Sequence, residues 1–525
     1  MNFRSLALAA FSGILLAVAF PAFDLHFLAW IALLPLFFAL KGQSVKNGFW
    51  LGGISGIAYF VGTVYWVTNS MHVYGGIPIV PASLLMLLLS AYLALYPAVF
   101  GAAAVHIRKN HPSLFFIAAP ALWTALELAR TYAFSGFPWS LLGYSQYLAL
   151  PVVQIADITG VYGVSFLIVL VNAALAEFIL DRKSRFGLIV VLFAMMLVLG
   201  YGFVKLRTPA QRAGITVSVV QGNIAQDKKW DSAFQGETLA EYKQLTREAL
   251  KEQPDLVIWP ETATPFYFSG AAPMDQVLTA DLVSFVKQNR VSLLFGSPTY
   301  EVKPNKRIIG RNSAFLLSAD GRVEGAYHKI HLVPFGEYVP LRNVLFFVGK
   351  MVQAIGDFQA GNEYTVMTVP VRGNVPRPDV KVSTVICYEI IFPDLVRRFV
   401  DKGANVITTV TNDAWFGRTA APYQHFSMAV FRAVENRVPV ARAANTGVSG
   451  FIDAQGHILA ASGIFTRVHL THTLVPGAEK TFYTRFGDLF AYACVLASLI
   501  MLVWTPKNPV TLLPRRHTLH SRYHS

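Results

Sequence analysis

A cysteine stands where an apolar, β-branched run gives way to a helix-like segment. Residues 382–386 read VSTVI, Cys387 follows them, and Pro393 begins the helix-like stretch. This pattern predicts a strand that delivers Cys387 to a strand-to-helix turn. Such a turn exposes the side chain, while the backbone N–H groups beyond it point at the reacting atom. The thiol could therefore be a nucleophile. The alternative is a buried structural cysteine, because free cysteine is among the most buried residue types.

Two further stretches place carboxylates and a lysine at strand ends or turns. Residues 255–259 read as a short apolar strand that ends before Pro260, and Glu261 follows just beyond its tip. Residues 327–337 carry Lys329 and Glu337 on either side of a Pro-Phe-Gly turn. Glutamate, lysine and cysteine together suit acyl transfer. The carboxylate accepts the thiol proton, and the ammonium stabilises a tetrahedral oxyanion and helps to lower the thiol pKa.

These stretches resemble the Glu–Lys–Cys pattern of the nitrilase, or carbon–nitrogen hydrolase, superfamily. The matching residues are Trp259-Pro260-Glu261, Lys329 and Cys387-Tyr388-Glu389. Fuller strings are similar to those of the apolipoprotein N-acyltransferases, and this likeness covers essentially the whole chain. The strings are residues 220–224 (VQGNI), 329–340 and 411–416 (TNDAWF). Any one string alone is a weak signal, whereas the three in this order are highly specific.

The resemblance implies a role for each residue of the site. Glu261 would be the general base and Cys387 the nucleophile, and Lys329 with the backbone N–H of Tyr388 would form the oxyanion hole. The other expected site residues would support the site or contact substrate: Glu337, Glu389, Trp230 and Trp415. The alternative for Glu389 is a local structural hydrogen bond, and the alternative for the two tryptophans is ordinary packing. His331 is the one rival base, because on a strand it would share the face of Lys329.

The same resemblance implies a reaction on lipids. An acyl chain would pass from a membrane phospholipid, through a thioester on Cys387, to the α-amino group of the N-terminal diacylglyceryl-cysteine of a lipoprotein, the last step of lipoprotein maturation. No cofactor is expected, because the donor is already an activated ester, and neither a Walker loop nor a metal-ligand spacing occurs. A membrane-anchored amidase that uses water as the acceptor would need the same three residues. A non-catalytic transporter or scaffold would not need them.

The composition is that of a membrane protein. Of 525 residues, 54% are hydrophobic and 14% are charged, against roughly a quarter charged in soluble proteins. The net charge of +14 fits basic loops that face anionic lipid, and no basic-aromatic motif for nucleic acid is present. Of the two cysteines, Cys494 lies in a long apolar segment. A disulfide is therefore implausible, and Cys387 should be a free thiol.

Eight apolar segments divide the chain. Residues 1–205 would form transmembrane helices 1–7, residues 212–475 a soluble domain, residues 486–504 an eighth helix and residues 505–525 a basic tail. The first segment could pass for a signal peptide, but six more apolar segments follow it before residue 210. The candidate spans are residues 5–22, 26–40, 49–69, 79–106, 114–130, 159–180, 187–205 and 486–504.

Basic residues set the expected orientation. The loops 70–78 and 131–158 contain no lysine or arginine, whereas the alternate loops and the tail are basic. The positive-inside rule then puts both termini in the cytoplasm and the soluble domain in the periplasm, at a bacterial inner membrane. Glu127 and Arg130 lie three residues apart in the fifth span, and a structural ion pair there is slightly favoured over a functional site.

The soluble domain alternates short strands with helices, which predicts a layered α/β fold. The resemblance implies the αββα sandwich of the nitrilases, which periodicity alone does not. Two apolar insertions, residues 265–270 and 345–355, are expected to be mobile arms that reach the bilayer or hold acyl chains, with ordinary core as the alternative. Strands are expected at 215–220, 255–259, 292–295, 313–317, 382–386, 405–410 and 438–443, and helices near 236–251, 278–289, 393–402 and 421–435.

Overall fold

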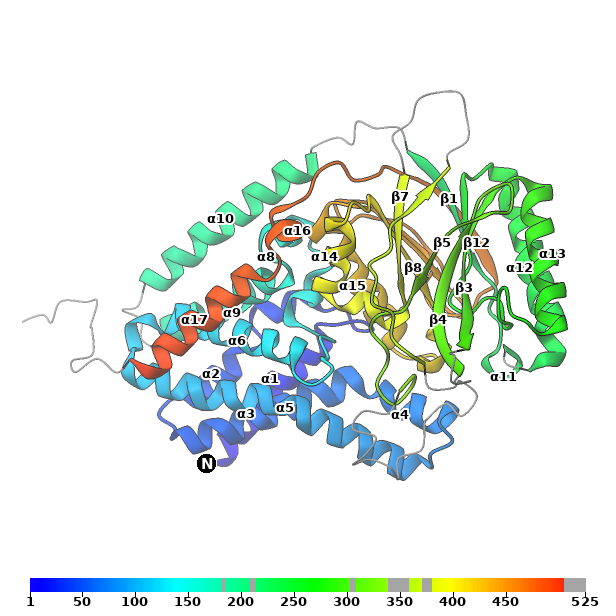
Figure 1. Ribbon diagram of the computed structural model, residues 1–525. Coiled ribbons are helices and arrows are strands. Elements are labelled where there is room, and N and C mark those ends of the chain that lie inside the picture. Colours follow the sequence, from blue (N-terminus) through cyan, green and yellow to red (C-terminus); the bar gives the residue numbers. More distant parts are fainter. Residues whose placement is uncertain are drawn as a thin grey trace, which may run out of the picture.

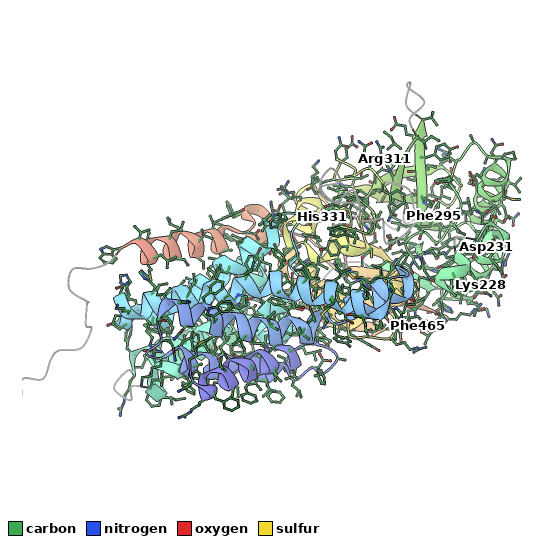
Figure 2. The ribbon with its side chains drawn as sticks, turned by 90° about the horizontal axis from the view of Figure 1, so that it is seen from below. Lys228, Asp231, Phe295, Arg311, His331 and Phe465 are labelled. Carbon is green, nitrogen blue, oxygen red and sulfur yellow. The ribbon has the colours of Figure 1, made fainter. Side chains whose placement is uncertain are left out.

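A helical bundle and an α/β domain pack against each other in the computed structural model (Figure 1). Figure 2 shows the same two parts from below, with the long helices on one side and the sheets on the other. The structure describes residues 1–180, 185–207, 214–229, 231–302, 308–338, 358–370 and 380–504. The predicted tail and the second predicted arm lie outside the described residues.

Every predicted apolar segment folds as a helix or a broken helix. The long or paired helices are α1 (Phe3–Val18), η1 (His26–Trp30) with α2 (Leu34–Leu40), α3 (Val45–Val64) with α4 (Trp66–Asn69), α5 (Ile79–Asn110), α6 (Phe115–Tyr132), α9 (Val161–Leu180), α10 (Phe186–Arg207) and α17 (Leu489–Val503). Shorter helices connect them: η2 (Ser70–Tyr74), η3 (Pro112–Leu114), η4 (Leu142–Gln146), α7 (Leu150–Val153), α8 (Ala156–Thr159) and α16 (Phe482–Phe486).

The described helices make this a multi-pass membrane protein. Four of them are long and apolar enough to cross a bilayer, and a fifth span results if the two segments 45–64 and 66–74, bent by 49°, count as one. The remaining apolar helices among the described residues are shorter than 18 residues: α1, the η1–α2 pair, the α7–α8 pair and α17. The count of eight spans therefore stays a prediction.

Small residues let α3 and α5 approach closely. A Cβ added to Gly52 would lie 2.0 Å from the carbonyl oxygen of Pro97, and one added to Gly48 would lie 2.5 Å from that of Gly101. In lipid, where apolar side chains gain little by leaving the solvent, such close backbone contact is a main source of helix association. These glycines therefore set the spacing of the helix pair that approaches the α/β domain at α4.

Two six-stranded sheets form the α/β domain. Parallel strands occupy the middle of each sheet: β1–β3 in the first and β7–β9 in the second. The first sheet has the order β12 (Val468–Leu474), β1 (Ile215–Gln221), β2 (Leu256–Ile258), β3 (Ser292–Val302), β4 (Ile308–Leu317) and β5 (Val323–His328). The second has the order β11 (Ile458–Ala461), β10 (Gly450–Ile452), β9 (Val440–Ala444), β8 (Val406–Thr411), β7 (Val380–Ile386) and β6 (Met367–Val369).

Helices cover the outer face of each sheet, which confirms the predicted αββα sandwich (Figure 1). The first sheet carries α12 (Gln235–Ala249) and α13 (Pro273–Asn289), and the second carries α14 (Pro393–Asp401) and α15 (Ala421–Asn436). One apolar core lies between the first sheet and its helices. A larger core runs from between the sheets through α14 and α15 into the membrane helices. The two parts of the protein are therefore packed as one body.

The first predicted arm is part of a core. Phe266 is 2% exposed and Phe268 is 4% exposed, and the ring of Phe268 lies 5.0 Å from the rings of both Phe295 and Phe315. The prediction of a mobile arm at residues 265–270 was wrong. Its apolar side chains face the helix-covered side of the first sheet, and burial there outweighs the entropy of a free loop.

A buried ion pair holds α15 against the membrane part. The guanidinium of Arg432 contacts both oxygens of Glu435 at 2.8 Å and also donates to the hydroxyl of Tyr144 at 3.0 Å. Glu435 accepts a further hydrogen bond from the backbone N–H of Val161 at 3.0 Å. Arg432 and Glu435 are both 0% exposed. A pair buried so fully is costly to break, because the charge left behind has no water to solvate it.

Arg432→Met should therefore destabilise the protein by about 3–5 kcal/mol, because it leaves Glu435 charged and buried. The expected result is a lower midpoint of thermal unfolding for the purified protein in detergent. Arg398→Met is the matched control. Arg398 pairs with Asp394 at 2.8 Å, but its side chain is 52% exposed, and an exposed pair contributes less than about 1 kcal/mol. Equal shifts for the two variants would contradict the assigned role of the buried pair.

Candidate active site

Cys387 lies in the strand-to-helix turn that the sequence predicted. β7 ends at Ile386, and η7 (Cys387–Ile391) follows before α14 starts at Pro393. The backbone of Cys387 has a φ of +54°, which is uncommon for a residue with a side chain. Strained backbone of this kind is concentrated at functional sites. The residue is 9% exposed, so the thiol is nearly closed off from solvent.

Glu261 and Lys329 come to Cys387 from the ends of two strands of the opposite sheet. Glu261 follows β2, and Lys329 follows β5. Oε1 of Glu261 lies 3.7 Å from Nζ of Lys329. Burial raises the pKa of the Cys387 thiol, the Glu261 carboxylate raises it further, and the Lys329 ammonium lowers it. The three side chains thus lie within electrostatic reach of one another, and the thiol needs a base to ionise near neutral pH.

Glu337 and Asn312 complete this arrangement. Nζ of Lys329 donates to Glu337 at 3.0 Å, and Nδ2 of Asn312 donates to Glu261 at 2.8 Å and to Glu337 at 2.9 Å. Burial alone would lower the pKa of Lys329, but the two carboxylates outweigh it and raise that pKa. The other oxygen of Glu261 accepts from the backbone N–H of Asn412 at 2.9 Å. Both carboxylate oxygens of Glu261 are therefore oriented.

Sequence reasoning missed Asn312. Its one available signal was an asparagine inside β4, among residues that otherwise suit a strand. Its side chain is 3% exposed, and a buried amide needs partners. The strand order β2-β3-β4-β5 then brings to it Glu261, which follows β2, and Glu337, which lies beyond β5.

Glu389 joins the nucleophile turn to the segment of Lys329. It is 0% exposed and accepts four hydrogen bonds from three parts of the domain. The donors are the backbone N–H groups of Ile386 at 2.7 Å, Ile330 at 2.7 Å and His331 at 2.9 Å, and the hydroxyl of Tyr327 at 2.7 Å. Burial raises the pKa of Glu389 to about 7, against the opposing effect of Lys329 and these donors. The structural role suggested as its alternative is thus observed, and it extends beyond local contacts.

A second buried network lies behind the nucleophile. Nε2 of His425 is 3.1 Å from the carbonyl oxygen of Cys387, and Nδ1 of His425 is 3.0 Å from Asp413. Arg442 donates to Asp413 at 2.8 Å. Burial would raise the pKa of Asp413, but Arg442 and His425 outweigh it and lower that pKa to about 2. The network holds the strained turn at its backbone carbonyl.

His331, the alternative general base, is poorly suited to accept the thiol proton. Burial and the charge of Lys329 lower the pKa of His331 to about 4, and its ring lies 3.8 Å from that of Phe392. The side chain of Tyr388 packs against the same phenylalanine and donates to the carbonyl of Gly136 in the membrane part at 3.3 Å. The residue after the nucleophile is thus fixed by both parts of the protein.

Of the two tryptophans predicted to contact substrate, the structure describes only Trp415. The carbonyl of Trp415 accepts from the hydroxyl of Ser70 at 2.7 Å, and its ring lies 5.4 Å from that of Tyr74. Trp415 thus contacts the end of the bent membrane helix, and its role in binding substrate stays a prediction. Trp230 lies outside the described residues. Within the described part of the chain, no cluster of three or more His, Cys, Asp or Glu side chains could hold a metal ion.

Known proteins match both parts of the chain. Residues 12–174 match the apolipoprotein N-acyltransferase N-terminal domain, and residues 216–477 match the carbon-nitrogen hydrolase family. An apolipoprotein N-acyltransferase from Geobacter metallireducens is 42% identical over 506 residues, which cover 95% of this chain and 94% of the relative. The chain belongs to the apolipoprotein N-acyltransferase family.

Other members of this family match over similar lengths. The apolipoprotein N-acyltransferase of Methylococcus capsulatus is 37% identical and covers 92% of this chain and 93% of its own. Among solved structures, an amidase from Nesterenkonia sp. shares 17% identity with a TM-score of 0.38, over 54% of this chain and 97% of its own. Nit3 of Saccharomyces cerevisiae, a member of branch 10 of the nitrilase superfamily, shares 20% identity with a TM-score of 0.38, over 51% of this chain and 93% of its own.

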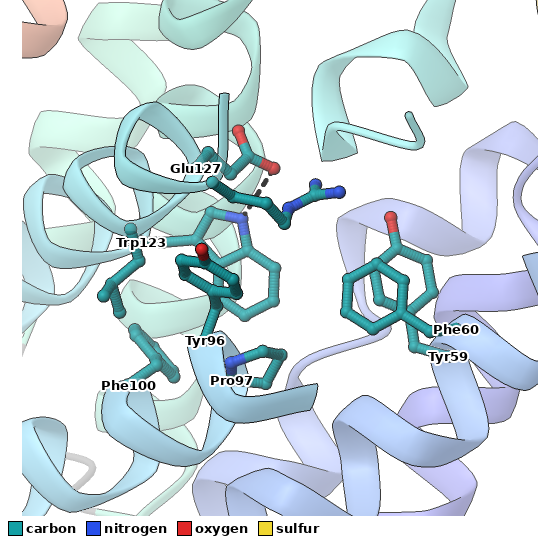
Figure 3. A pocket seen from close by; sticks show the side chains of 9 residues that line it. Tyr59, Phe60, Tyr96, Pro97, Phe100, Trp123 and Glu127 are labelled. Carbon is teal, nitrogen blue, oxygen red and sulfur yellow. Dashed lines mark hydrogen bonds between the residues drawn. The ribbon is translucent and has the colours of Figure 1, made fainter. Parts of the chain in front are cut away.

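In this family member, Glu127 and Arg130 do not form the predicted ion pair. Arg130 donates to the carbonyl oxygens of Phe137, Trp139 and Ser140, and Glu127 accepts from the indole of Trp123 and from the backbone N–H of Leu142. They line a cavity of about 20 Å³ together with aromatic residues of α3, α5 and α6 (Figure 3). A cavity of that size holds about one water molecule. Both side chains fasten the loop after α6, which carries the residues that reach Tyr388.

Glu389→Gln should slow formation of an acyl adduct on Cys387 by roughly 10²-fold. The glutamine amide keeps only one of the two oxygen atoms that accept hydrogen bonds in Glu389. Its NH₂ group takes the place of the other oxygen and must face one of the four donors. The measurement is the rate of acyl-adduct formation on Cys387, followed by intact mass. Glu363→Gln is the control, because this glutamate is exposed and lies in the loop before β6. Equal rates for the two variants would show that Glu389 does not order the site.

Proposed function

We propose that this protein transfers an acyl chain from a membrane phospholipid to the α-amino group of a diacylglyceryl-cysteine at the N-terminus of a lipoprotein. The observation that carries the proposal is the placement of Glu261, with both oxygens oriented, 3.7 Å from Lys329 and in electrostatic reach of Cys387. Membership of the family supports the choice of acceptor, and the multi-pass membrane part supports a lipid donor.

In the first half-reaction Glu261 accepts the thiol proton of Cys387, and the sulfur attacks the ester carbonyl of the phospholipid. Lys329 and the backbone N–H of Tyr388 stabilise the resulting oxyanion. The C–O bond then breaks, and the proton held by Glu261 passes to the departing lysophospholipid oxygen. The acyl chain stays on Cys387 as a thioester.

In the second half-reaction the α-amino group of the lipoprotein attacks the thioester carbonyl. Glu261 now accepts a proton from the amine, and the C–S bond breaks. The proton passes to the sulfur, which restores the thiol of Cys387 and releases the N-acylated lipoprotein. Glu337 orients Lys329 throughout, since it holds the ammonium at 3.0 Å.

The membrane part brings the lipid to this site. In this proposal α1, the η1–α2 pair and α17 also cross the bilayer, which gives eight spans and leaves both termini in the cytoplasm. The catalytic domain, residues 212–475, then lies in the periplasm of a bacterial inner membrane. The donor ester supplies the energy of transfer, so neither ATP nor acyl-CoA takes part.

The test is the intact mass of the purified protein after incubation with a diacyl phospholipid. The proposal expects a gain of one acyl chain that hydroxylamine removes. A diacylglyceryl-cysteine peptide should then take the chain onto its amine. Discharge to water alone would instead support a membrane-anchored amidase. If no adduct forms but a soluble amide is hydrolysed, the lipid donor is wrong.

A further inference from the structure

Lys229 is a buried cation beside the active site that the mechanism above does not use. It is the last residue of the short helix α11 (Gln226–Lys229) and is 1% exposed. Its Nζ donates to the backbone carbonyl oxygen of Glu261 at 2.8 Å. Among the described residues, no carboxylate lies within ion-pair distance of Lys229. A buried ammonium bound only to a neutral carbonyl is costly, so a compensating interaction is expected.

The charges around the nucleophile supply that interaction. Among the described residues, Lys329 is the one ammonium in direct contact with the carboxylates of Glu261 and Glu337. Two carboxylates and one ammonium leave an excess negative charge, which would oppose a thiolate at Cys387. A second ammonium at Lys229 makes the group neutral.

The other charged groups nearby have partners of their own or are exposed. Asp413 is paired with Arg442 at 2.8 Å. Glu389 lies behind the turn, where it accepts four hydrogen bonds. On its own helix, Lys229 is accompanied by Asp227 and Lys228, which are both exposed. Burial lowers the pKa of Lys229 to about 8, while Glu261 and Cys387 act in the opposite direction.

We infer that Lys229 is a positioning residue for the proposed acyl transfer. Its hydrogen bond holds the turn of Glu261, where Thr262 has a φ of +47°. Its charge offsets the second carboxylate, so that Cys387 loses its proton more readily. This inference rests on the proposed role of Cys387 as the nucleophile and not on the identity of donor or acceptor.

The experiment separates the charge from the hydrogen bond. Lys229→Gln keeps a donor for the Glu261 carbonyl but removes the charge, whereas Lys229→Arg keeps the charge. Lys228→Gln, at the exposed neighbour, is the matched control. The readout is the pH dependence of alkylation of Cys387 by iodoacetamide, measured by peptide mass in full-length protein in detergent, with Cys494 replaced by alanine.

The midpoint of alkylation should rise by roughly one pH unit in Lys229→Gln, since a charge at this range shifts a pKa by about that much. It should stay within a few tenths of the wild-type value in Lys229→Arg and Lys228→Gln. An unchanged midpoint in Lys229→Gln would overturn the inference. If Lys229→Gln does not fold, Lys229→Arg provides the test: a raised alkylation midpoint in that variant, which keeps the charge, would also overturn the inference. Alkylation does not require acyl transfer, so a protein that shows these shifts without forming a phospholipid adduct would disprove the proposed function and leave this inference standing.

Discussion

Cys387→Ala should abolish acyl transfer, with a rate loss of at least ~10⁴-fold, because its sulfur carries the proposed thioester. The measurement is the transfer of a labelled acyl chain from phospholipid to a diacylglyceryl-cysteine peptide. Intact mass should show no hydroxylamine-labile adduct on the variant. The side chain is small and lies in a turn held by Glu389 and His425, so the fold should persist.

Cys494→Ala is the control for this result. Cys494 lies in α17 and is 6% exposed, so it is also a buried cysteine, but it lies in a membrane helix. The variant should form the adduct and transfer the chain at the wild-type rate. If the adduct survives in Cys387→Ala and disappears in Cys494→Ala, the acyl chain is carried by the membrane helix and the proposed role of Cys387 is wrong.

Glu261→Gln should slow formation of the acyl adduct by roughly 10³-fold, since general base catalysis contributes about 10²–10⁴-fold. The amide cannot accept the thiol proton. The two carboxylate oxygens of Glu261 accept hydrogen bonds from the side chain of Asn312 and from the backbone N–H of Asn412. In the glutamine variant, the NH₂ group must face one of these two donors. The measurement is the single-turnover rate of acylation, followed by quenching and intact mass.

Glu324→Gln is the matched control, because Glu324 is exposed on β5, the strand that leads to Lys329. Its acylation rate should equal that of the wild type. A Glu261→Gln rate within threefold of this control would mean that another group accepts the proton. His331 would then be the residue to replace next, despite its lowered pKa.

Local sequence patterns predicted the elements well. The β-branched run before Cys387 and the helix after Pro393 placed the nucleophile turn correctly, because strand and helix propensities agree with the period of burial there. The apolar segments likewise mark helices at every predicted position. The arm at residues 265–270 was wrong, since an apolar loop segment looks the same in sequence whether it covers a core or faces lipid.

The sequence by itself determined the two-part architecture, the turn that carries Cys387 and the residue types available for acyl transfer. Only the tertiary structure decided that Asn312 and Asn412 orient Glu261, and that Lys229 reaches its carbonyl. These contacts join residues 32 to 151 positions apart in the chain. The reason is physical: strand order and the face-to-face packing of two sheets determine which strand ends meet, and no local propensity encodes that order.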